Sequence, residues 1–164
     1  LHSALREDPD VILVGEMRDL ETISIAVTAA EMGILVMGTL HTNGSAQTVD
    51  RIVNTFPADK QSHIRTMLST SLRGVVSQQL LPTKGKPGRV AALEILINTS
   101  AVANLIRQGK LDQLETAMQS GGATGMRTMD SALMELVEKK MVSGREAYQQ
   151  ANNKAKFQSV KDDA

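Results

Sequence analysis

The sequence predicts an α/β fold in which a mainly parallel sheet and a β-hairpin precede a small helical subdomain. Two short apolar runs, residues 11–15 and 34–40, flank a segment with helical spacing of apolar residues, which is typical of a βαβ unit. Two further strand-like runs lie on either side of a turn-forming segment rich in Pro, Gly and Lys. Residues 99–152 show only short helical patterns punctuated by glycines.

The composition limits the possible classes of function. Hydrophobic residues make up 41% and charged residues 22% of the 164 residues, as in ordinary globular domains. Eighteen basic and 18 acidic side chains cancel, which argues against a dedicated nucleic-acid or membrane-surface binder. Aromatic residues are only 2%, so base stacking is nearly excluded. The absence of cysteine excludes disulfides and thiolate zinc sites.

The first predicted elements form a βαβ unit. Residues 8–10 contain a proline that breaks any helix, and the β-branched run over 11–15 indicates a strand buried on both faces of a parallel sheet. Asp19 is expected to cap the next helix, and Gly33 to end it. Residues 34–40 then form a second buried strand. No apolar run in the sequence reaches the roughly 18 residues of a membrane span.

The remaining pattern alternates helices and strands before it becomes wholly helical. We predict strands over 75–81 and 89–97, and helices over 45–55, 59–74, 99–108, 111–119, 128–140 and 143–152. The predicted organisation is an α/β core over residues 1–98, a helical subdomain over 99–152, and a frayed polar tail over 153–164. Residues 1–6 have the character of a helix end, so we expect the sequence to begin within a fold.

Polar side chains follow both strands of the predicted βαβ unit. Glu16 comes after the first strand and His41 after the second, at the sheet edge where open α/β folds bind ligands. A carboxylate there can orient or deprotonate water for attack on a phosphate, and a histidine can donate a hydrogen bond to that phosphate. Taken singly, Glu16 is equally compatible with an ordinary surface glutamate, and a single histidine such as His41 is more often a packed or solvated residue. Their paired placement favours a site.

Other polar residues near this edge have two possible interpretations. Thr39 and Thr42 supply short hydrogen-bond donors, and Arg18 can reach a phosphate, a neighbouring subunit or simply a surface carboxylate. Arg51 and Arg65 fit a subunit boundary or a solvated helix face equally well. The three histidines lack the i, i+4 spacing of a helical zinc site, so we expect no protein-bound metal.

The sequence contains no Gly-x-x-x-x-Gly-Lys-Ser/Thr phosphate loop. Residues 84–86 are no substitute, because they lie between two predicted strands and do not open a helix. If the site binds a nucleotide, the main phosphate cradle and its lysine would have to precede residue 1. We therefore expect the 164-residue chain alone to hydrolyse nucleotide poorly or not at all.

Two long motifs resemble those of the type II/type IV secretion ATPases. Residues 8–19, DPDVILVGEMRD, are similar to the Walker B segment of that family. Residues 39–46, TLHTNGSA, continued by residues 50–52 and 56–57, are similar to its His box. The resemblance extends through residues 89–95 and 125–130. It implies the second half of a RecA-like P-loop NTPase core.

The resemblance implies a role for the paired residues. Within the family, the sequence is most similar to the PilT-type ATPases that retract type IV pili. These are cytoplasmic hexamers that dock on an inner-membrane platform protein and power twitching motility. Glu16 would then be the catalytic, water-activating glutamate and His41 the phosphate sensor, and we expect Arg18, Thr39 and Thr42 to contact ATP bound with Mg²⁺. No nucleic-acid partner is expected, and the membrane would be reached only through the platform protein.

Related subfamilies are alternatives. Secretion and assembly ATPases of the GspE and PilB type usually carry a four-cysteine zinc module after the His box, whereas residues 78–88 have no cysteine, which favours the retraction type. The retraction type carries an AIRNLIRE motif, and residues 101–108 here are AVANLIRQ, with changes at Ala103 and Gln108. A PilU-like accessory retraction ATPase remains an alternative.

Two more distant functions are further alternatives. In one, residues 99–152 form a binding or oligomerisation module that exposes Val102, Leu105 and Ile106. Their helical spacing equally describes a buried face, and we favour the buried face. In the other, the protein is a nucleic-acid translocase, against which the neutral charge and scarce aromatics argue.

Overall fold

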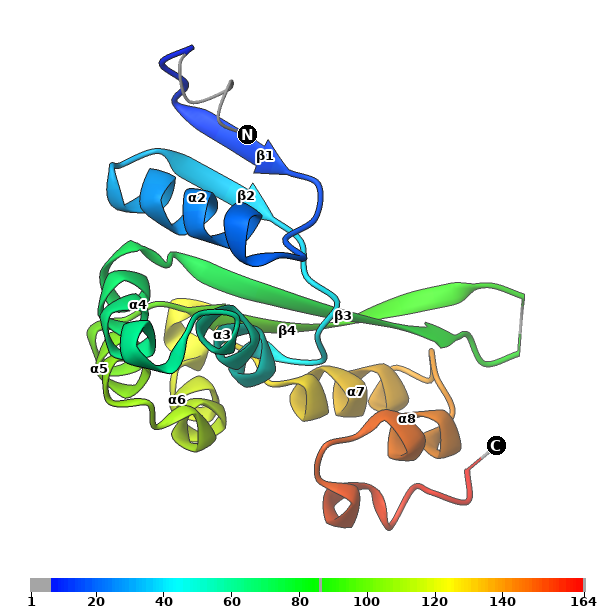
Figure 1. Cartoon of the computed structure of the whole chain (residues 1–164). Helices are drawn as coiled ribbons and strands as arrows, with labels where there is room; N and C mark the ends of the chain where they lie inside the picture. The colour runs from blue at the N-terminus through cyan, green and yellow to red at the C-terminus, as the bar shows by residue number, and fades with distance from the viewer. Residues whose placement is uncertain (1–6, 86, 164) are drawn as a thin grey trace. The chain divides into compact units, whose positions relative to one another are not determined.

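The computed structural model in Figure 1 describes residues 7–85 and 87–163. It divides into two compact units, each built from two stretches of the chain. Unit 1 contains the chain up to Gly74 together with Asn98–Ala117, and unit 2 contains Val75–Ile97 and the chain from Met118 onward. This differs from the division expected at residue 98, because the hairpin strands pack with the later helices. The helix end predicted over residues 1–6 lies outside the described residues.

Unit 1 begins with the predicted βαβ unit. Strand β1 (Val11–Val14) and strand β2 (Leu35–Gly38) are parallel and are connected by helix α2 (Leu20–Glu31). Asp19 caps α2, since its carboxylate accepts a hydrogen bond from the backbone N–H of Thr22 at 2.8 Å. Beyond the other end of α2, Gly33 has a left-handed φ of 98° that suits glycine. The α/β class is therefore confirmed, with strands somewhat shorter than predicted.

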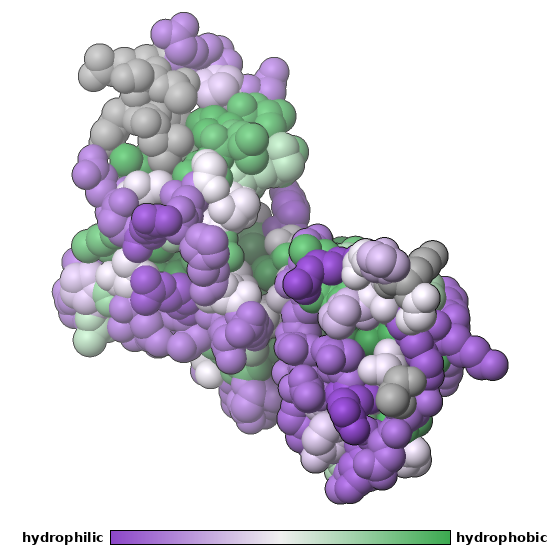
Figure 2. All heavy atoms as spheres, turned by 90° about the vertical axis from the view of Figure 1, so that its right-hand side faces the viewer, coloured by the Kyte–Doolittle hydropathy of each residue, from purple (hydrophilic) through white to green (hydrophobic). Residues whose placement is uncertain are grey.

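The β1–β2 sheet is covered on one face only. Ile12 and Val14 are buried with Ala26 and Ala29 of α2, whereas Leu13 is 73% exposed. The other exposed apolar side chains of the two strands are Val11, Leu35 and Met37. Figure 2 shows hydrophobic surface in its upper part, where these strands lie. The expectation that both faces are buried is thus wrong for this structure, because the described sheet has two strands and α2 covers one side.

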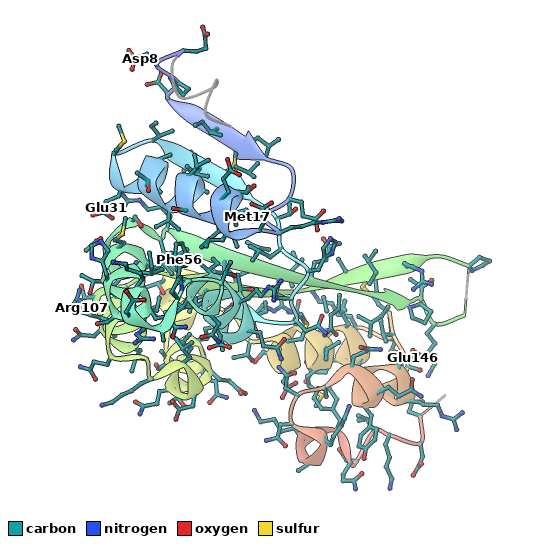
Figure 3. The ribbon with its side chains drawn as sticks, in the orientation of Figure 1. Asp8, Met17, Glu31, Phe56, Arg107 and Glu146 are labelled. Atoms are coloured by element: carbon teal, nitrogen blue, oxygen red, sulfur yellow. The ribbon has the colours of Figure 1, made fainter. Side chains whose placement is uncertain are left out.

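Helices form the rest of unit 1. Helix α4 (Ala58–Ser71) packs against α2, against α3 (Ser45–Asn54) and against α5 (Ser100–Gln108). Phe56 is buried in the connection between α3 and α4 (Figure 3). A short 3₁₀ turn, η1 (Leu111–Gln113), follows α5 and leads into α6 (Leu114–Ser120). None of the helices in the described part of the chain is both long and apolar enough to cross a membrane.

Helix α5 contains the segment over residues 101–108 and is fixed to α4 by packing and hydrogen bonds. Val102 and Ile106 are fully buried, as their spacing favoured, whereas Leu105 is only partly buried. The Arg107 Nε donates to the Ser69 hydroxyl at 3.2 Å, and another nitrogen of the same guanidinium donates to the Asn104 side chain at 3.1 Å. The amide of Asn98 donates to two carbonyls at the end of α4, at 3.1 and 2.8 Å. These side chains therefore stabilise the α4–α5 packing.

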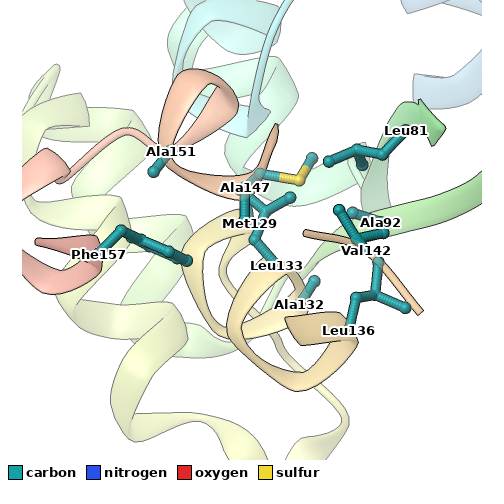
Figure 4. Packing of buried hydrophobic residues seen from close by; sticks show 10 residues of the cluster. All are labelled: Leu81, Ala92, Met129, Ala132, Leu133, Leu136, Val142, Ala147, Ala151 and Phe157. Carbon is teal, nitrogen blue, oxygen red and sulfur yellow. The ribbon is translucent and has the colours of Figure 1, made fainter. Parts of the chain in front are cut away.

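Unit 2 combines the hairpin with the C-terminal helices. Strands β3 (Gly74–Pro82) and β4 (Arg89–Ile97) pair with each other. Helix α7 (Met129–Glu138) packs on β4 and on α8 (Gly144–Gln150). Short 3₁₀ turns are η2 (Gly122–Thr124) and η3 (Lys154–Phe157). Ten buried residues form the core of this unit (Figure 4): Leu81, Ala92, Met129, Ala132, Leu133, Leu136, Val142, Ala147, Ala151 and Phe157.

The start of α7 is anchored by three neighbouring interactions. The Thr128 hydroxyl caps the helix by accepting a hydrogen bond from the Ser131 N–H at 3.2 Å. Buried Glu94 of β4 accepts from the Met129 N–H at 3.2 Å, where a carboxylate also complements the helix dipole. Arg127 forms an antiparallel bridge with Ile95. Together these contacts fix the start of α7 against β4.

The C-terminal segment is packed, so the prediction of a frayed tail over 153–164 is wrong for the described residues. Phe157 is fully buried in the unit 2 core. The buried Asp130 carboxylate accepts hydrogen bonds from the N–H groups of Asn152 at 2.8 Å and Asn153 at 3.0 Å. At Gly144, an added Cβ would lie 1.9 Å from the carbonyl oxygen of Val160, so only glycine permits this approach. The segment is polar in composition, but the buried Phe157 and these backbone contacts hold it in place.

Candidate functional site

The strand ends that carry the predicted site are held together beyond β1 and β2. The Met17 N–H donates to the Thr39 carbonyl at 2.9 Å, and the Thr39 hydroxyl donates to the Gly15 carbonyl. Figure 3 shows Met17 in the turn that follows β1. These two bonds fix the backbone on both sides of Glu16 against the residues that lead to His41. The backbone therefore places the two predicted catalytic side chains at one edge of the sheet.

Three of the predicted residues meet in space. The Nε2 of His41 lies 3.0 Å from the Oε1 of Glu16, and the Nε of Arg18 forms an ion pair with the same oxygen. Glu16 is the most enclosed of the three, with 26% of its side chain exposed against 75% for Arg18 and 82% for His41. For the histidine to donate in this contact, its Nε2 carries the proton. The site is thus a carboxylate bracketed by two basic groups and open to solvent.

Electrostatics keep the Glu16 carboxyl ionised. The guanidinium of Arg18 lowers the pKa of Glu16 below its ordinary value by hydrogen bonding and charge, with a smaller contribution from His41. Glu16 in turn raises the pKa of Arg18. At neutral pH the carboxylate is therefore a hydrogen-bond acceptor, which suits it to orient a water molecule. A carboxylate in this state is a weak proton acceptor, and loss of the Arg18 contact would make it more basic.

A hollow of about 200 Å³ opens beside these groups. It is lined by Glu16, Met17, Arg18, Leu40, His41 and Arg51. A larger hollow of about 260 Å³ lies elsewhere in unit 1, between the βαβ unit and α4, and its lining is mostly apolar. Because Arg73 is its one charged lining residue, that larger space lacks the acid–base groups that catalysis needs. The smaller hollow is therefore the candidate site.

The two predicted threonines are near the site but have structural partners. Thr39 bridges the two strand ends, as described above. The hydroxyl of Thr42 shares a hydrogen bond of 2.8 Å with the hydroxyl of Thr48, which connects the loop after β2 to helix α3. Neither threonine lines the hollow. Their proposed contact with nucleotide stays a prediction, and their observed contacts position the loop that carries His41.

Arg51 is the lining residue that sequence reasoning did not select. The spacing of residues in the sequence fits two locations for Arg51 equally well, a subunit boundary and a solvated helix face. One signal was available, since Arg51 is the only basic residue of α3, the helix that directly follows the His41 loop. Arg65, which had the same two interpretations, lies beside Gly109 and does not line the hollow. Within the described residues, no group of three or more His, Cys, Asp or Glu side chains is arranged to hold a metal ion.

Comparison with known proteins gives close relatives. The chain is 57% identical over 153 residues to a twitching motility protein of Neisseria gonorrhoeae, covering 93% of this chain and 41% of the relative. It is 56% identical over 151 residues to the type IV pilus retraction ATPase PilT of Pseudomonas aeruginosa, covering 92% of this chain and 44% of PilT. Identity to the type IV pilus ATPase PilU of the same organism is 40% over 153 residues, covering 93% of this chain and 40% of PilU. The chain thus spans less than half the length of these relatives.

The structural comparison agrees with the sequence comparison. A crystal structure of the pilus retraction motor PilT with bound ADP matches with a TM-score of 0.85 at 45% identity, over 94% of this chain and 43% of that one. The predicted likeness to the ATPase fold is thereby confirmed. The model of the type II/IV secretion system protein family matches residues 1–161. The chain therefore belongs to the type II/IV secretion system protein family.

Proposed function

We propose that this chain is the part of a hexameric ATPase motor that activates water for ATP hydrolysis, and that the motor powers type IV pilus retraction and twitching motility. The observation that supports this most directly is the Glu16–His41 contact of 3.0 Å, at the sheet edge where open α/β folds bind ligands. The identity of 56–57% to retraction and twitching proteins supports the same motor.

In this proposal each residue of the site has a defined role. Glu16 orients and deprotonates the attacking water, while His41 donates a hydrogen bond to the terminal phosphate and senses its presence. Arg18, Thr39 and Thr42 contribute nucleotide contacts. The hollow offers one carboxylate against three basic side chains, so a Mg²⁺ ion bound here would take most of its oxygen ligands from phosphate groups and water.

The assembly around the chain belongs to the same proposal. We infer a homohexamer in the cytoplasm that docks on a platform protein at the inner face of the bacterial inner membrane, without a nucleic-acid partner. A PilU-like accessory ATPase is a second candidate, and the changes at Ala103 and Gln108 in the segment over 101–108 are the features that favour it. The higher identity to PilT than to PilU supports the retraction motor over the accessory one.

The role of Glu16 is tested by Glu16→Gln in the intact parent protein. We expect magnesium-dependent ATP turnover to be abolished while nucleotide binding is largely retained, because the amide keeps the shape of the side chain and cannot accept a proton. Turnover is measured as phosphate release, and binding by fluorescence of a labelled nucleotide. Glu138→Gln, a change at an exposed glutamate at the end of α7, is the matched control.

Two results would contradict the proposal. Normal turnover in the Glu16→Gln protein would show that this carboxylate is not the base. Robust ATPase activity from the 164-residue chain alone would show that no separate phosphate loop is needed, against the absence of that motif from its sequence.

A further inference from the structure

The hollow beside Glu16 has an imbalance of charge. Of its lining residues, one is acidic and three are basic: Arg18, His41 and Arg51. Arg18 and His41 both direct a nitrogen to the same Glu16 oxygen, so the single carboxylate is already shared between them. Among the ion pairs between described residues, none includes Arg51. The guanidinium of Arg51 therefore adds to the hollow a positive charge that no carboxylate of the described residues pairs with.

Helix α3 holds Arg51 firmly at this place. Val49, Ile52 and Val53 are buried on the inner face of the helix, with exposures of 1%, 6% and 2%, while Arg51 lies on the exposed face. The backbone N–H of Asn43 donates to the Gln47 side chain at 3.2 Å, which adds a second connection between the helix and the loop after β2, besides the Thr42–Thr48 bond. The loop that carries His41 and the helix that carries Arg51 are thus joined locally.

We propose that Arg51 is an anion-binding residue of this hollow, which takes a phosphate group together with His41. The proposal rests on the proposed ATPase function and adds a residue to it. A guanidinium presents donors in a planar fork that matches two oxygens of a phosphate, which an ammonium group cannot do. Glu16 would repel an anion by itself, but Arg18 neutralises that carboxylate in the structure, so the second guanidinium, that of Arg51, gives the anion its net attraction.

The test is a titration of the 164-residue chain with inorganic phosphate at constant ionic strength. Backbone amide NMR signals of Leu40 and His41 report binding in the hollow. In the wild type we expect chemical-shift changes at these residues that saturate with phosphate. In Arg51→Gln we expect phosphate to bind at least about tenfold more weakly than in the wild type, as the loss of one charge-assisted hydrogen bond predicts. Arg51→Lys retains the charge without the fork and should give intermediate affinity.

Arg145→Gln is the matched control, because Arg145 is an exposed arginine on helix α8 that does not line the hollow. Equal weakening by Arg51→Gln and Arg145→Gln would indicate general charge screening and overturn the proposal. Unchanged binding in Arg51→Gln, or no saturable shift in the wild type, would overturn it as well. Each result is independent of ATP turnover by Glu16→Gln in the parent protein, so failure of this assignment is distinguishable from failure of the ATPase proposal.

Discussion

At the residue scale, the arrangement around Glu16 depends on one oxygen atom with two basic neighbours. The Oε1 of Glu16 is contacted by both Arg18 and His41, and the carboxylate is held ionised as a result. In a hydrolytic site, such a carboxylate can hold a water molecule by hydrogen bonding, but it is a weak acceptor of the proton of that water. If Arg18 moves to a bound phosphate, as its predicted role requires, Glu16 becomes more basic when substrate is present.

The ion pair between Arg18 and Glu16 predicts how Arg18→Gln changes the pKa of Glu16. Arg18 lowers the pKa of Glu16, so its removal should raise the midpoint of the carboxyl titration toward the ordinary value. The stabilisation from the Arg18–Glu16 pair is accordingly present above the ordinary pKa of glutamate and is lost as pH falls through the lowered value. Carbon NMR of the Glu16 carboxyl measures the midpoint, with Arg145→Gln as control. An unmoved midpoint would show that the ion pair does not form in solution.

The sequence indicated Glu16, His41 and Arg18 correctly as residues near one another, but its spacing did not single out Arg51. The first three lie within a few residues of the carboxyl ends of two neighbouring strands. Because the strands are parallel, these ends meet at the same edge of the sheet. Arg51 reaches the hollow from a helix whose orientation is set by tertiary packing, which spacing does not encode. Thr39 and Thr42 were correctly placed near the strand ends, while their hydroxyl partners depended on local backbone geometry.

At the element scale, helix caps were the most predictable features and strand burial the least. The Asp19 cap follows from local chemistry that involves the next three residues only. Whether both faces of β1 and β2 are buried depends on which elements cover the sheet. In this structure α2 covers one face and the other face is exposed. An apolar run therefore predicted a strand correctly without fixing its surroundings.

The N-terminal cap of α7 is expected to contribute to the stability of the fold. Thr128 is buried and its hydroxyl accepts from the Ser131 N–H, so Thr128→Ala should lower the free energy of unfolding by about 1 kcal/mol. Thr128→Ser keeps the hydroxyl and should cost clearly less. Urea unfolding followed by circular dichroism measures both variants. Equal losses in the two would assign the effect to the methyl group and its packing, against the capping role.

At the scale of the whole molecule, the unit 2 core joins residues that are far apart in the sequence. Leu81 and Ala92 of the hairpin, Leu133 of α7 and Phe157 of the C-terminal segment belong to one buried cluster. Such contacts leave no trace in local periodicity, which is why the polar residues around Phe157 suggested a frayed end. The overall α/β class was predictable, whereas the way in which the chain divides into two units was not.

The burial of Phe157 predicts a large effect on stability. Phe157→Ala removes a fully buried aromatic side chain and should cost about 3–5 kcal/mol, a substantial part of the roughly 5–15 kcal/mol that stabilises a typical domain. Thermal unfolding compares it with Lys156→Ala, a change at the exposed neighbouring residue. A loss below about 1 kcal/mol would mean that the C-terminal segment is detached in solution.

The interleaving of the two units has a practical consequence for preparing shorter versions of the protein. The chain passes from one unit to the other after Gly74, after Ile97 and after Ala117. Cutting the gene at any one of these points leaves part of a unit on each fragment, and a cut near residue 98 separates the hairpin from the Leu133–Phe157 cluster that covers it. Neither unit is therefore obtainable by simple truncation, and a recombinant unit 2 would need its two stretches rejoined by a designed linker.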